Sequence, residues 1–326
     1  LVYHGVTRKN ERKGIEDYQN NHIDKKKFYE QVQYLAENYN VITGDELIDS
    51  IKAKKSLPDY SLLITIDDGY KNNHTTAYPI LRCFNLPAIV FIPTAFINNK
   101  KALWSDKIIY SLSRTKQNMI SFNVNSKTKC FDISNSKKKM LADRQIRQII
   151  LLKDLEERYR IINSIIDETN IDLDEDIERY EDYSSISWNE LRKISEHNIY
   201  IGAHTHNHVC LSALTKKRIT EELKTANREL LDNLGYESKI FAYPYGGLNS
   251  FDKKSKALLK DFGYVCSFIN VAGFNDFSKE YDLFELKRIS IENDMDFITF
   301  KARITGFYQY ISAIKQQLVN LWKRYL

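Results

Sequence analysis

Residues 62–69, Leu-Leu-Ile-Thr-Ile-Asp-Asp-Gly, contain the feature that decides the fold. The apolar run Leu62–Ile66 is short and rich in β-branched residues, which predicts a buried strand rather than a helix. Two carboxylates, Asp67 and Asp68, end that strand, and Gly69 lets the chain turn sharply after them. Acids at the carboxyl end of a strand are typical of an active-site edge in an α/β sheet or barrel. Asp-Asp-Gly is also an ordinary turn, so this stretch alone leaves both interpretations open.

A cluster of histidines lies in residues 202–208, Gly-Ala-His-Thr-His-Asn-His, directly after the strand-like residues 199–201. His204 and His208 are four apart, so a helical turn beginning here would place both imidazoles on one face. Two histidines plus one carboxylate form a frequent metal site with positions left for water or substrate. We therefore predict a metal role for this segment, with structural or merely exposed histidines as the alternative. The Glu of a His-Glu-x-x-His metalloprotease helix is missing.

A third segment, residues 241–247 (Phe-Ala-Tyr-Pro-Tyr-Gly-Gly), also follows a short apolar strand. Pro244 fixes its own backbone angle, and the glycine pair allows a tight turn. Such a stiffened loop can hold the backbone N–H of Tyr245 at a fixed point, where it can stabilise an oxyanion forming on a carbonyl under attack. Taken alone the segment is simply a turn, and its functional meaning depends on the other two segments.

In this order, the Asp-Asp-Gly turn, the His-Thr-x-x-His segment and the Tyr-Pro-Tyr-Gly loop resemble the polysaccharide deacetylases of carbohydrate esterase family four. Residues 1–6, Leu-Val-Tyr-His-Gly-Val, also resemble the first strand of many members. The resemblance covers residues 1–98 and 185–292. It implies an irregular (β/α)7 barrel and a metal-dependent deacetylase.

The resemblance also implies roles for single residues. Asp67 is expected to be the catalytic base, and the expected ligands of zinc or a similar divalent ion are Asp68, His204 and His208. The backbone N–H of Tyr245 would face the acetyl oxygen, and the candidate substrate contacts are Tyr243, Pro244 and Tyr245. His206 occupies a variable position of the family, which favours a supporting or merely exposed role for it.

The chain departs from the family pattern at two positions. The third motif often carries an Arg that orients the base, and that position is Ala242. Arg288 can supply the charge from a different strand; the alternative is a surface Arg at a strand end. The late motif often carries a His that acts as general acid, yet no His follows His208. His4 is the candidate replacement, and the alternative is a buried His hydrogen-bonded across the barrel.

The rest of the pattern alternates between strands and helices. Strands are expected at 1–4, 62–66, 88–92, 199–203, 239–242, 264–268 and 286–291. Helices are expected at 25–38, 45–54, 73–83, 188–197, 215–234 and 252–262. This alternation predicts βα units and a parallel sheet closed into a barrel.

One domain is expected over residues 1–326, and residues 100–185 interrupt its alternation as a largely helical insertion. Helices are expected there at 104–112 and 143–166, with a short hairpin at 121–131. We interpret this insertion as a cap or lid beside the barrel mouth.

The C-terminal residues 307–326 have apolar side chains at helical spacing and several basic ones. They predict an amphipathic helix that packs on the barrel or, alternatively, rests on a membrane, where it would suit a lipid-linked sugar. Cys83 and Cys266 lie in apolar contexts and are expected to be packed thiols, which favours a reducing compartment. A cytoplasmic or membrane-peripheral location is therefore expected, although a removed N-terminal signal peptide stays open.

Composition narrows the class of function. The net charge of +5 is mild, and no tight Lys/Arg patch with interleaved aromatics occurs, so a nucleic-acid partner is not indicated. The leading hypothesis is a metal-dependent hydrolase that removes an acetyl group from an amino sugar of a cell-envelope polysaccharide or its precursor. Deacylation of a non-sugar amide or an O-acetyl ester is one alternative. A catalytically impaired carbohydrate-binding barrel is another, favoured by Ala242 and the missing late His but opposed by the intact acids and histidines.

Overall fold

The computed structural model describes residues 1–99, 101–277 and 281–307. The helix predicted at 307–326 lies outside the described residues from position 308 onward. No helix in the described ranges is long and apolar enough to cross a membrane.

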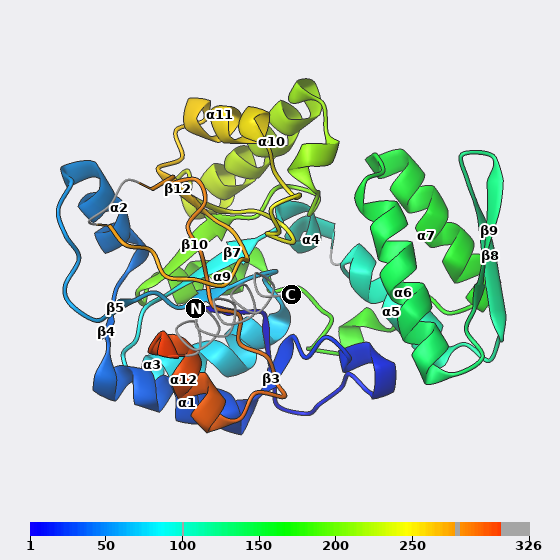
Figure 1. Cartoon of the computed structure of the whole chain (residues 1–326), viewed down its shortest axis with the longest axis horizontal. Helices are drawn as coiled ribbons and strands as arrows, with labels where there is room; N and C mark the ends of the chain where they lie inside the picture. Colours follow the sequence, from blue (N-terminus) through cyan, green and yellow to red (C-terminus); the bar gives the residue numbers. More distant parts are fainter. Residues whose placement is uncertain (100, 278–280, 308–326) are drawn as a thin grey trace, which may run out of the picture.

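Six short parallel strands form the central sheet, in the order β1-β6-β7-β10-β11-β12 (Figure 1). Their bounds are Val2–Tyr3, Thr65–Ile66, Ala88–Ile92, Ile199–Ala203, Ile240–Ala242 and Cys266–Phe268. The segment 286–291 joins the two edges, because Leu286 bridges to Phe268 of β12 and Ser290 bridges to Val2 of β1, both in parallel. This segment completes the half-barrel of the six strands. The predicted (β/α)7 barrel is therefore confirmed.

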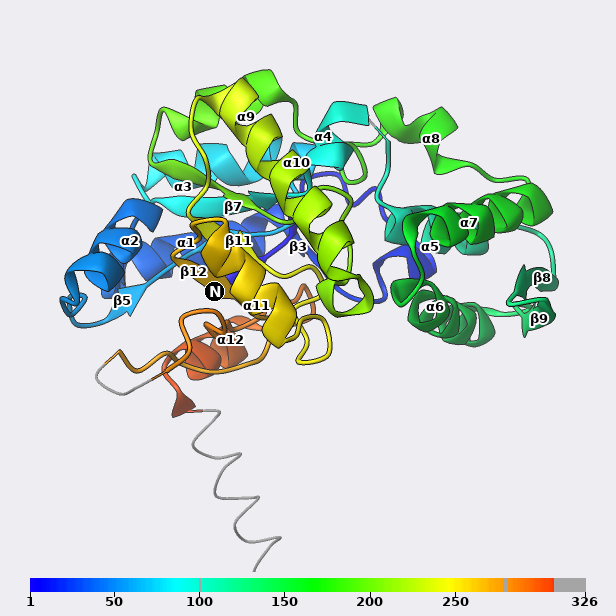
Figure 2. The same ribbon diagram turned by 90° about the horizontal axis from the view of Figure 1, so that it is seen from above.

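Helices surround the barrel (Figures 1 and 2). They are α1 (Lys25–Asn38), α2 (Gly44–Ala53), α3 (Tyr78–Cys83), α4 (Thr94–Asn99), α9 (Trp188–Ser195), α10 (Lys216–Leu234), α11 (Lys253–Asp261) and α12 (Phe297–Ile304). Short strand pairs flank the barrel: β2 (Gly5–Thr7) with β3 (His22–Asp24), and β4 (Asn40–Val41) with β5 (Ser61–Leu62). Side-chain caps fix several helix starts; Asp24 caps α1, and Thr43 forms a capping box with Glu46 on α2.

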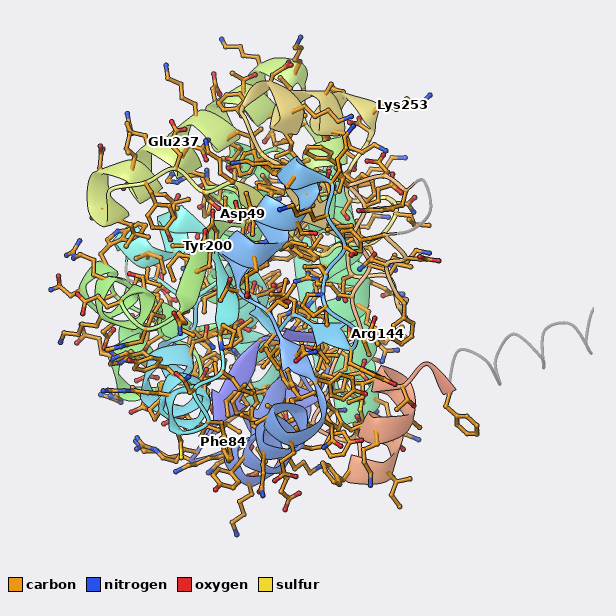
Figure 3. All side chains as sticks on the ribbon, turned by 90° about the vertical axis from the view of Figure 1, so that its left-hand side faces the viewer. Asp49, Phe84, Arg144, Tyr200, Glu237 and Lys253 are labelled. Atoms are coloured by element: carbon orange, nitrogen blue, oxygen red, sulfur yellow. The ribbon has the colours of Figure 1, made fainter. Side chains whose placement is uncertain are left out.

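Alternate residues of each strand face two different cores. On β7, Val90 packs with the outer helices, whereas Ile89 and Phe91 face the barrel interior together with Leu286. Helix α2 closes the interior at the amino-terminal end of the strands, where its Gly44 lies against the ring of Tyr200 of β10. Figure 3 labels Tyr200 and, on α2, Asp49. The candidate site lies at the opposite, carboxyl-terminal end of the barrel.

The insertion forms a separate layer beside the barrel, drawn in green on the right of Figure 1. Its elements are α5 (Trp104–Arg114), β8 (Met119–Val124), β9 (Lys127–Asp132), α6 (Ser136–Leu151), α7 (Leu155–Thr169) and α8 (Leu173–Asp176), followed by the 3-10 turn Ile177–Arg179. It has its own apolar core, which includes Ile108, Ile146 and Ile161. The single helix predicted at 143–166 is wrong, because the chain breaks after α6 and Asp154 caps a new helix.

The cysteine prediction is half right. Cys266 is buried on β12, whereas Cys83 at the end of α3 is exposed, so it is not a packed thiol. Both thiols are free, as are Cys130 and Cys210.

Candidate active site

The three segments singled out in the sequence meet at the carboxyl-terminal end of the barrel. Asp67 and Asp68 follow β6, His204 follows β10, and Tyr245 follows β11. These side chains line one cavity of about 560 Å³. Because parallel strands end at a common edge, segments far apart in the sequence are brought together there.

Asp68, His204 and His208 form a compact set of metal-ligand atoms. The Oδ1 atom of Asp68 lies 3.2 Å from Nε2 of His208 and 3.7 Å from Nε2 of His204. One ligand atom from each residue lies within 4.8 Å of the others, and all three residues are buried. One carboxylate oxygen and two imidazole nitrogens suit zinc or a similar divalent ion, so the residues present fit such a group.

A backbone carbonyl fixes the orientation of one predicted ligand. Nδ1–H of His204 donates to the carbonyl oxygen of Ala242 at 2.7 Å. The lone pair of this imidazole is therefore on Nε2, the atom that faces Asp68. Burial lowers the pKa of His204 to about 4, with the charge of Asp67 opposing it and that of His208 adding to it. The imidazole is therefore neutral and ready to bind a metal at neutral pH.

The pKa of Asp68 also favours ligation. Burial alone would raise it, but the hydrogen bond from His208 and the charges of the neighbouring histidines hold it well below its usual range. The backbone is strained at Asp68, a non-glycine residue with φ of 77°, whereas Gly69 adopts its φ of 68° without such a cost. A Cβ atom on Gly69 would lie 2.8 Å from Cγ2 of Ile92, so both conformation and space require glycine there.

The histidine segment is a loop, and the helical turn considered for it is wrong. Thr205 and His208 both have left-handed backbones, with φ of 63° and 50°. Glu222 of α10 holds this loop, because its Oε2 accepts from the backbone N–H groups of His206 and Asn207 at 2.9 and 2.8 Å. Nδ1 of His206 lies 2.8 Å from the hydroxyl oxygen of Thr94, and the role of this side chain stays a prediction.

Sequence reasoning missed Glu222, although a signal existed. It lies three residues after Ile219 and four before Ala226, on the apolar face of α10. A buried carboxylate on such a face needs hydrogen-bond donors, and the histidine loop supplies them.

Asp67 is held by Arg288 in a bidentate ion pair. Nη1 of Arg288 lies 2.7 Å from Oδ1 of Asp67, and Nη2 lies 2.8 Å from Oδ2. The guanidinium also donates to Thr65 Oγ1 and to the carbonyl of Ile269. Arg288 is 3% exposed, so the alternative of a surface Arg is wrong. The positive charge that an Arg at position 242 would supply comes instead from Arg288 in the segment 286–291. Burial would raise the pKa of Asp67, but the charges of Arg288 and His204 outweigh it and leave this pKa lowered.

The three candidate substrate contacts in the loop after β11 differ in burial and in whether they line the cavity. Tyr245 lines the cavity with φ of 66°, and its backbone N–H donates to no other described residue. Its hydroxyl donates to the carbonyl of His208 at 2.9 Å. Tyr243 also lines the cavity, but it is 1% exposed and its ring stacks on Phe251. Pro244 is buried outside the cavity lining. Of the three candidate substrate contacts, Tyr245 is the best placed.

Two further histidines, His4 and His22, line the cavity with the candidate ligands. His4 is half-buried, so the alternative of a fully buried core histidine does not describe it. His22, which sequence reasoning missed, is 2% exposed, and its Nδ1 lies 3.2 Å from Nδ2 of Asn72. Oδ1 of Asn72 accepts from the backbone N–H of Val6, so Nδ2 is the donor and His22 Nδ1 accepts. The role of His4 as general acid stays a prediction.

The insertion also reaches the histidine loop. Nε1–H of Trp104 on α5 donates to the hydroxyl of Tyr245 at 2.8 Å. The guanidinium of Arg158 on α7 is 2% exposed, and its Nη1 donates to the carbonyl of His208 at 3.3 Å. Neither residue belongs to a sequence motif. Their contacts with the site arise only when the insertion packs beside the barrel.

Comparison with known proteins agrees with this geometry. The model of the polysaccharide deacetylase family matches residues 156–267, which include both candidate ligand histidines and the Tyr245 loop. A putative polysaccharide deacetylase, YxkH of Bacillus subtilis, is 28% identical over 109 residues, which are 33% of this chain and 36% of that protein. The Escherichia coli K12 poly-beta-1,6-N-acetyl-D-glucosamine N-deacetylase is 34% identical over 61 residues, or 18% of this chain and 9% of that protein. The chain thus spans about a third or less of these relatives' lengths.

Solved structures share the fold over most of the chain. The Streptococcus pyogenes deacetylase PplD, solved with acetate, has a TM-score of 0.61 at 14% identity and covers 93% of this chain and 96% of its own. IcaB from Ammonifex degensii has a TM-score of 0.58 at 16% identity, and the match covers 93% of this chain and 95% of IcaB. Fold and matched segment together define a deacetylase-type barrel. Residues 156–267 match the model of the polysaccharide deacetylase family, and the resemblance seen in the sequence is confirmed.

Proposed function

We propose that this protein is a metal-dependent hydrolase that removes an N-acetyl group from an amino sugar of a cell-envelope polysaccharide or its precursor. The observation that carries the proposal is the ligand set of Asp68, His204 and His208 beside the Arg288-bound carboxylate of Asp67, in one cavity. The name of the Escherichia coli relative supports an N-acetylated amino sugar as substrate.

Each residue of the site has a chemical task in this proposal. A divalent ion on the three ligands would lower the pKa of a bound water towards ~7 and polarise the acyl carbonyl. Asp67 takes a proton from the attacking water, and Arg288 keeps that carboxylate ionised and oriented. The backbone N–H of Tyr245 donates to the oxyanion.

The departing nitrogen must also receive a proton. When the carbon–nitrogen bond breaks, His4 protonates the amine, and acetate and the free amino sugar are released. Its place in the cavity lining supports this assignment. The membrane contact of residues 307–326 and the cytoplasmic or membrane-peripheral location remain predictions.

The test is acetate release from β-1,6- and β-1,4-linked oligomers of N-acetylglucosamine by the zinc-loaded protein, with Asp67→Asn as the inactive comparison. We expect release by the wild type and a loss in the variant. Faster cleavage of an O-acetyl ester or a non-sugar amide would favour those substrates instead. Oligomer binding without any acetate would indicate an impaired, carbohydrate-binding barrel.

A further inference from the structure

Asn270 is a polar residue of the catalytic cavity that the reaction described above does not use. It lies two residues after β12, and it lines the cavity together with Tyr245 and Arg288. No sequence motif singled it out. Its side chain ends in a neutral amide, which offers two N–H donors at one end and an acceptor oxygen at the other.

On one side, Asn270 packs against the loop that carries the proposed oxyanion donor. Its backbone N–H donates to the carbonyl of Gly246 at 2.8 Å. The two residues are so close that a Cβ atom on Gly246 would lie 2.5 Å from Cβ of Asn270. Gly246 directly follows Tyr245, whose backbone N–H is the proposed donor. The side chain of Asn270 therefore begins beside the oxyanion loop.

On the other side, Asn270 adjoins the arginine that holds the proposed base. The carbonyl of Ile269, the residue before it, accepts from Nε of Arg288 at 3.2 Å. The same guanidinium forms the bidentate pair with Asp67. Asn270 thus lies between the groups that hold the base and the oxyanion donor. During attack by water the acyl group has to lie within reach of both.

One end of the Asn270 amide is fixed and the other is available. Its Oδ1 accepts from the hydroxyl of Ser290 at 2.6 Å. Its Nδ2 has no hydrogen-bond partner among the described residues, yet it is not one of their buried unsatisfied atoms. The amide nitrogen is therefore accessible, in a residue that lines the cavity.

We propose that Nδ2–H of Asn270 is a second donor to the acyl oxygen, beside the backbone N–H of Tyr245. This inference rests on the proposed function and deepens it, because it adds a catalytic residue to the same site. A neutral amide suits the task, since it stabilises negative charge on the oxygen without gaining or losing a proton itself. Because Ser290 holds Oδ1, the donor is oriented before the substrate binds.

The first test measures binding, so that it does not depend on turnover. Zinc-loaded protein is titrated by calorimetry with acetohydroxamate, a small zinc ligand that contains no sugar and whose carbonyl oxygen stands in for the acyl oxygen. Asn270→Ala should weaken this binding about tenfold, the size of one hydrogen bond to a charged group. Asn270→Asp keeps an acceptor for Ser290 but loses the donor, so it should bind no better than Asn270→Ala.

Asn249→Ala is the matched control, since Asn249 is exposed after the same loop and lies outside the cavity lining. It should bind acetohydroxamate as the wild type does. Acetate release gives the second readout. A donor that acts in the transition state should affect kcat, so Asn270→Ala should lower kcat by about 10²-fold, with KM and zinc content nearly unchanged.

Three results would overturn the proposal. The first is no acetohydroxamate binding by the wild type, and the second is unchanged affinity in Asn270→Ala; an effect on KM alone would then place Asn270 against the sugar. The third is wild-type behaviour of Asn270→Asp, since only the bond to Ser290 would then matter. Weaker acetohydroxamate binding in Asn270→Ala, in a protein whose wild type releases no acetate, would keep the donor and reject the deacetylase.

Discussion

The barrel and the insertion contribute to the same cavity in different ways. The barrel supplies the reactive groups, because the ends of its strands carry Asp67, Asp68 and His204 and a following loop carries His208. The insertion supplies none of the metal-ligand candidates found in the described residues. It instead contributes polar side chains to the cavity lining, such as Arg144 and Gln148. It also donates two hydrogen bonds to loops of the site, from Arg158 to the carbonyl of His208 and from Trp104 to the hydroxyl of Tyr245.

The barrel thus carries the groups proposed to react, and the insertion carries groups that hold them in place. Groups on strand ends are fixed by the closed sheet, whose period of two aims Thr65, Asp67 and Arg288 into the barrel interior. Groups on the insertion hold two residues of the site, because Trp104 donates to the hydroxyl of Tyr245 and Arg158 donates to the carbonyl of His208. Changes in the barrel should therefore abolish metal binding or turnover. Changes in the insertion should lower metal affinity or turnover only in part.

The largest effect is expected for the metal ligands of the barrel. His204→Ala removes one of two nitrogen donors, so metal affinity should fall by more than the roughly 10–100-fold that outer-shell partners contribute. The measurement is zinc affinity by competition with a chromogenic chelator, with circular dichroism to confirm folding. His206→Ala is the control, because its side chain faces Thr94 rather than the ligands. Unchanged affinity in His204→Ala would remove this residue from the ligand set.

Asp67→Asn should separate catalysis from metal binding. The amide keeps the shape of the side chain but takes up no proton, so turnover should fall by about 10²–10⁴-fold. Metal content should stay near that of the wild type, since Asp68 is the neighbouring ligand candidate. The measurements are acetate release and elemental analysis on the same preparation. Near-normal turnover would exclude Asp67 as the base.

Arg288→Met should lower stability as well as turnover, because Arg288 holds the Asp67 carboxylate. It leaves the buried Asp67 carboxylate without its partner, which costs about 3–5 kcal/mol in comparable cases. In the wild type the lowered pKa of Asp67 stabilises the fold above the ordinary carboxyl pKa, and that contribution is lost as pH falls through the folded-state pKa. Urea unfolding should therefore show a deficit at pH 7 that narrows towards acid. A deficit that Asp67→Asn does not partly restore in the double variant would contradict the pairing.

The smallest effect is expected from the insertion. Arg158→Met removes the hydrogen bond to the carbonyl of His208, and zinc affinity should fall by up to about tenfold. Arg160→Met is the matched control, since Arg160 lies on the same helix but pairs with Glu157 at the surface. Tighter zinc binding in Arg158→Met would mean that this buried cation acts by repelling the metal, not by holding the loop.

Much of the barrel could be predicted from its sequence, because buried strands and strand-end motifs are local patterns. All seven expected strand segments take part in the sheet or bridge its edges. The support of the site was harder to see. Arg288 shares strand parity with the buried Leu286, which would have favoured an inward position, but Glu222 and Arg158 gain their roles from partners in other layers. The loop of His204 and His208 depends on left-handed backbone at Thr205 and His208, and no sequence pattern predicts this conformation at non-glycine residues.

The central claim is a divalent metal on Asp68, His204 and His208. Its most direct test is the metal content per chain of the purified, zinc-reconstituted protein, beside Asp68→Ala and the exposed control Asp59→Ala. The account predicts close to one ion per chain in the wild type and in Asp59→Ala, and little in Asp68→Ala. Absence of stoichiometric metal from the wild type after reconstitution, or full retention in Asp68→Ala, would contradict it.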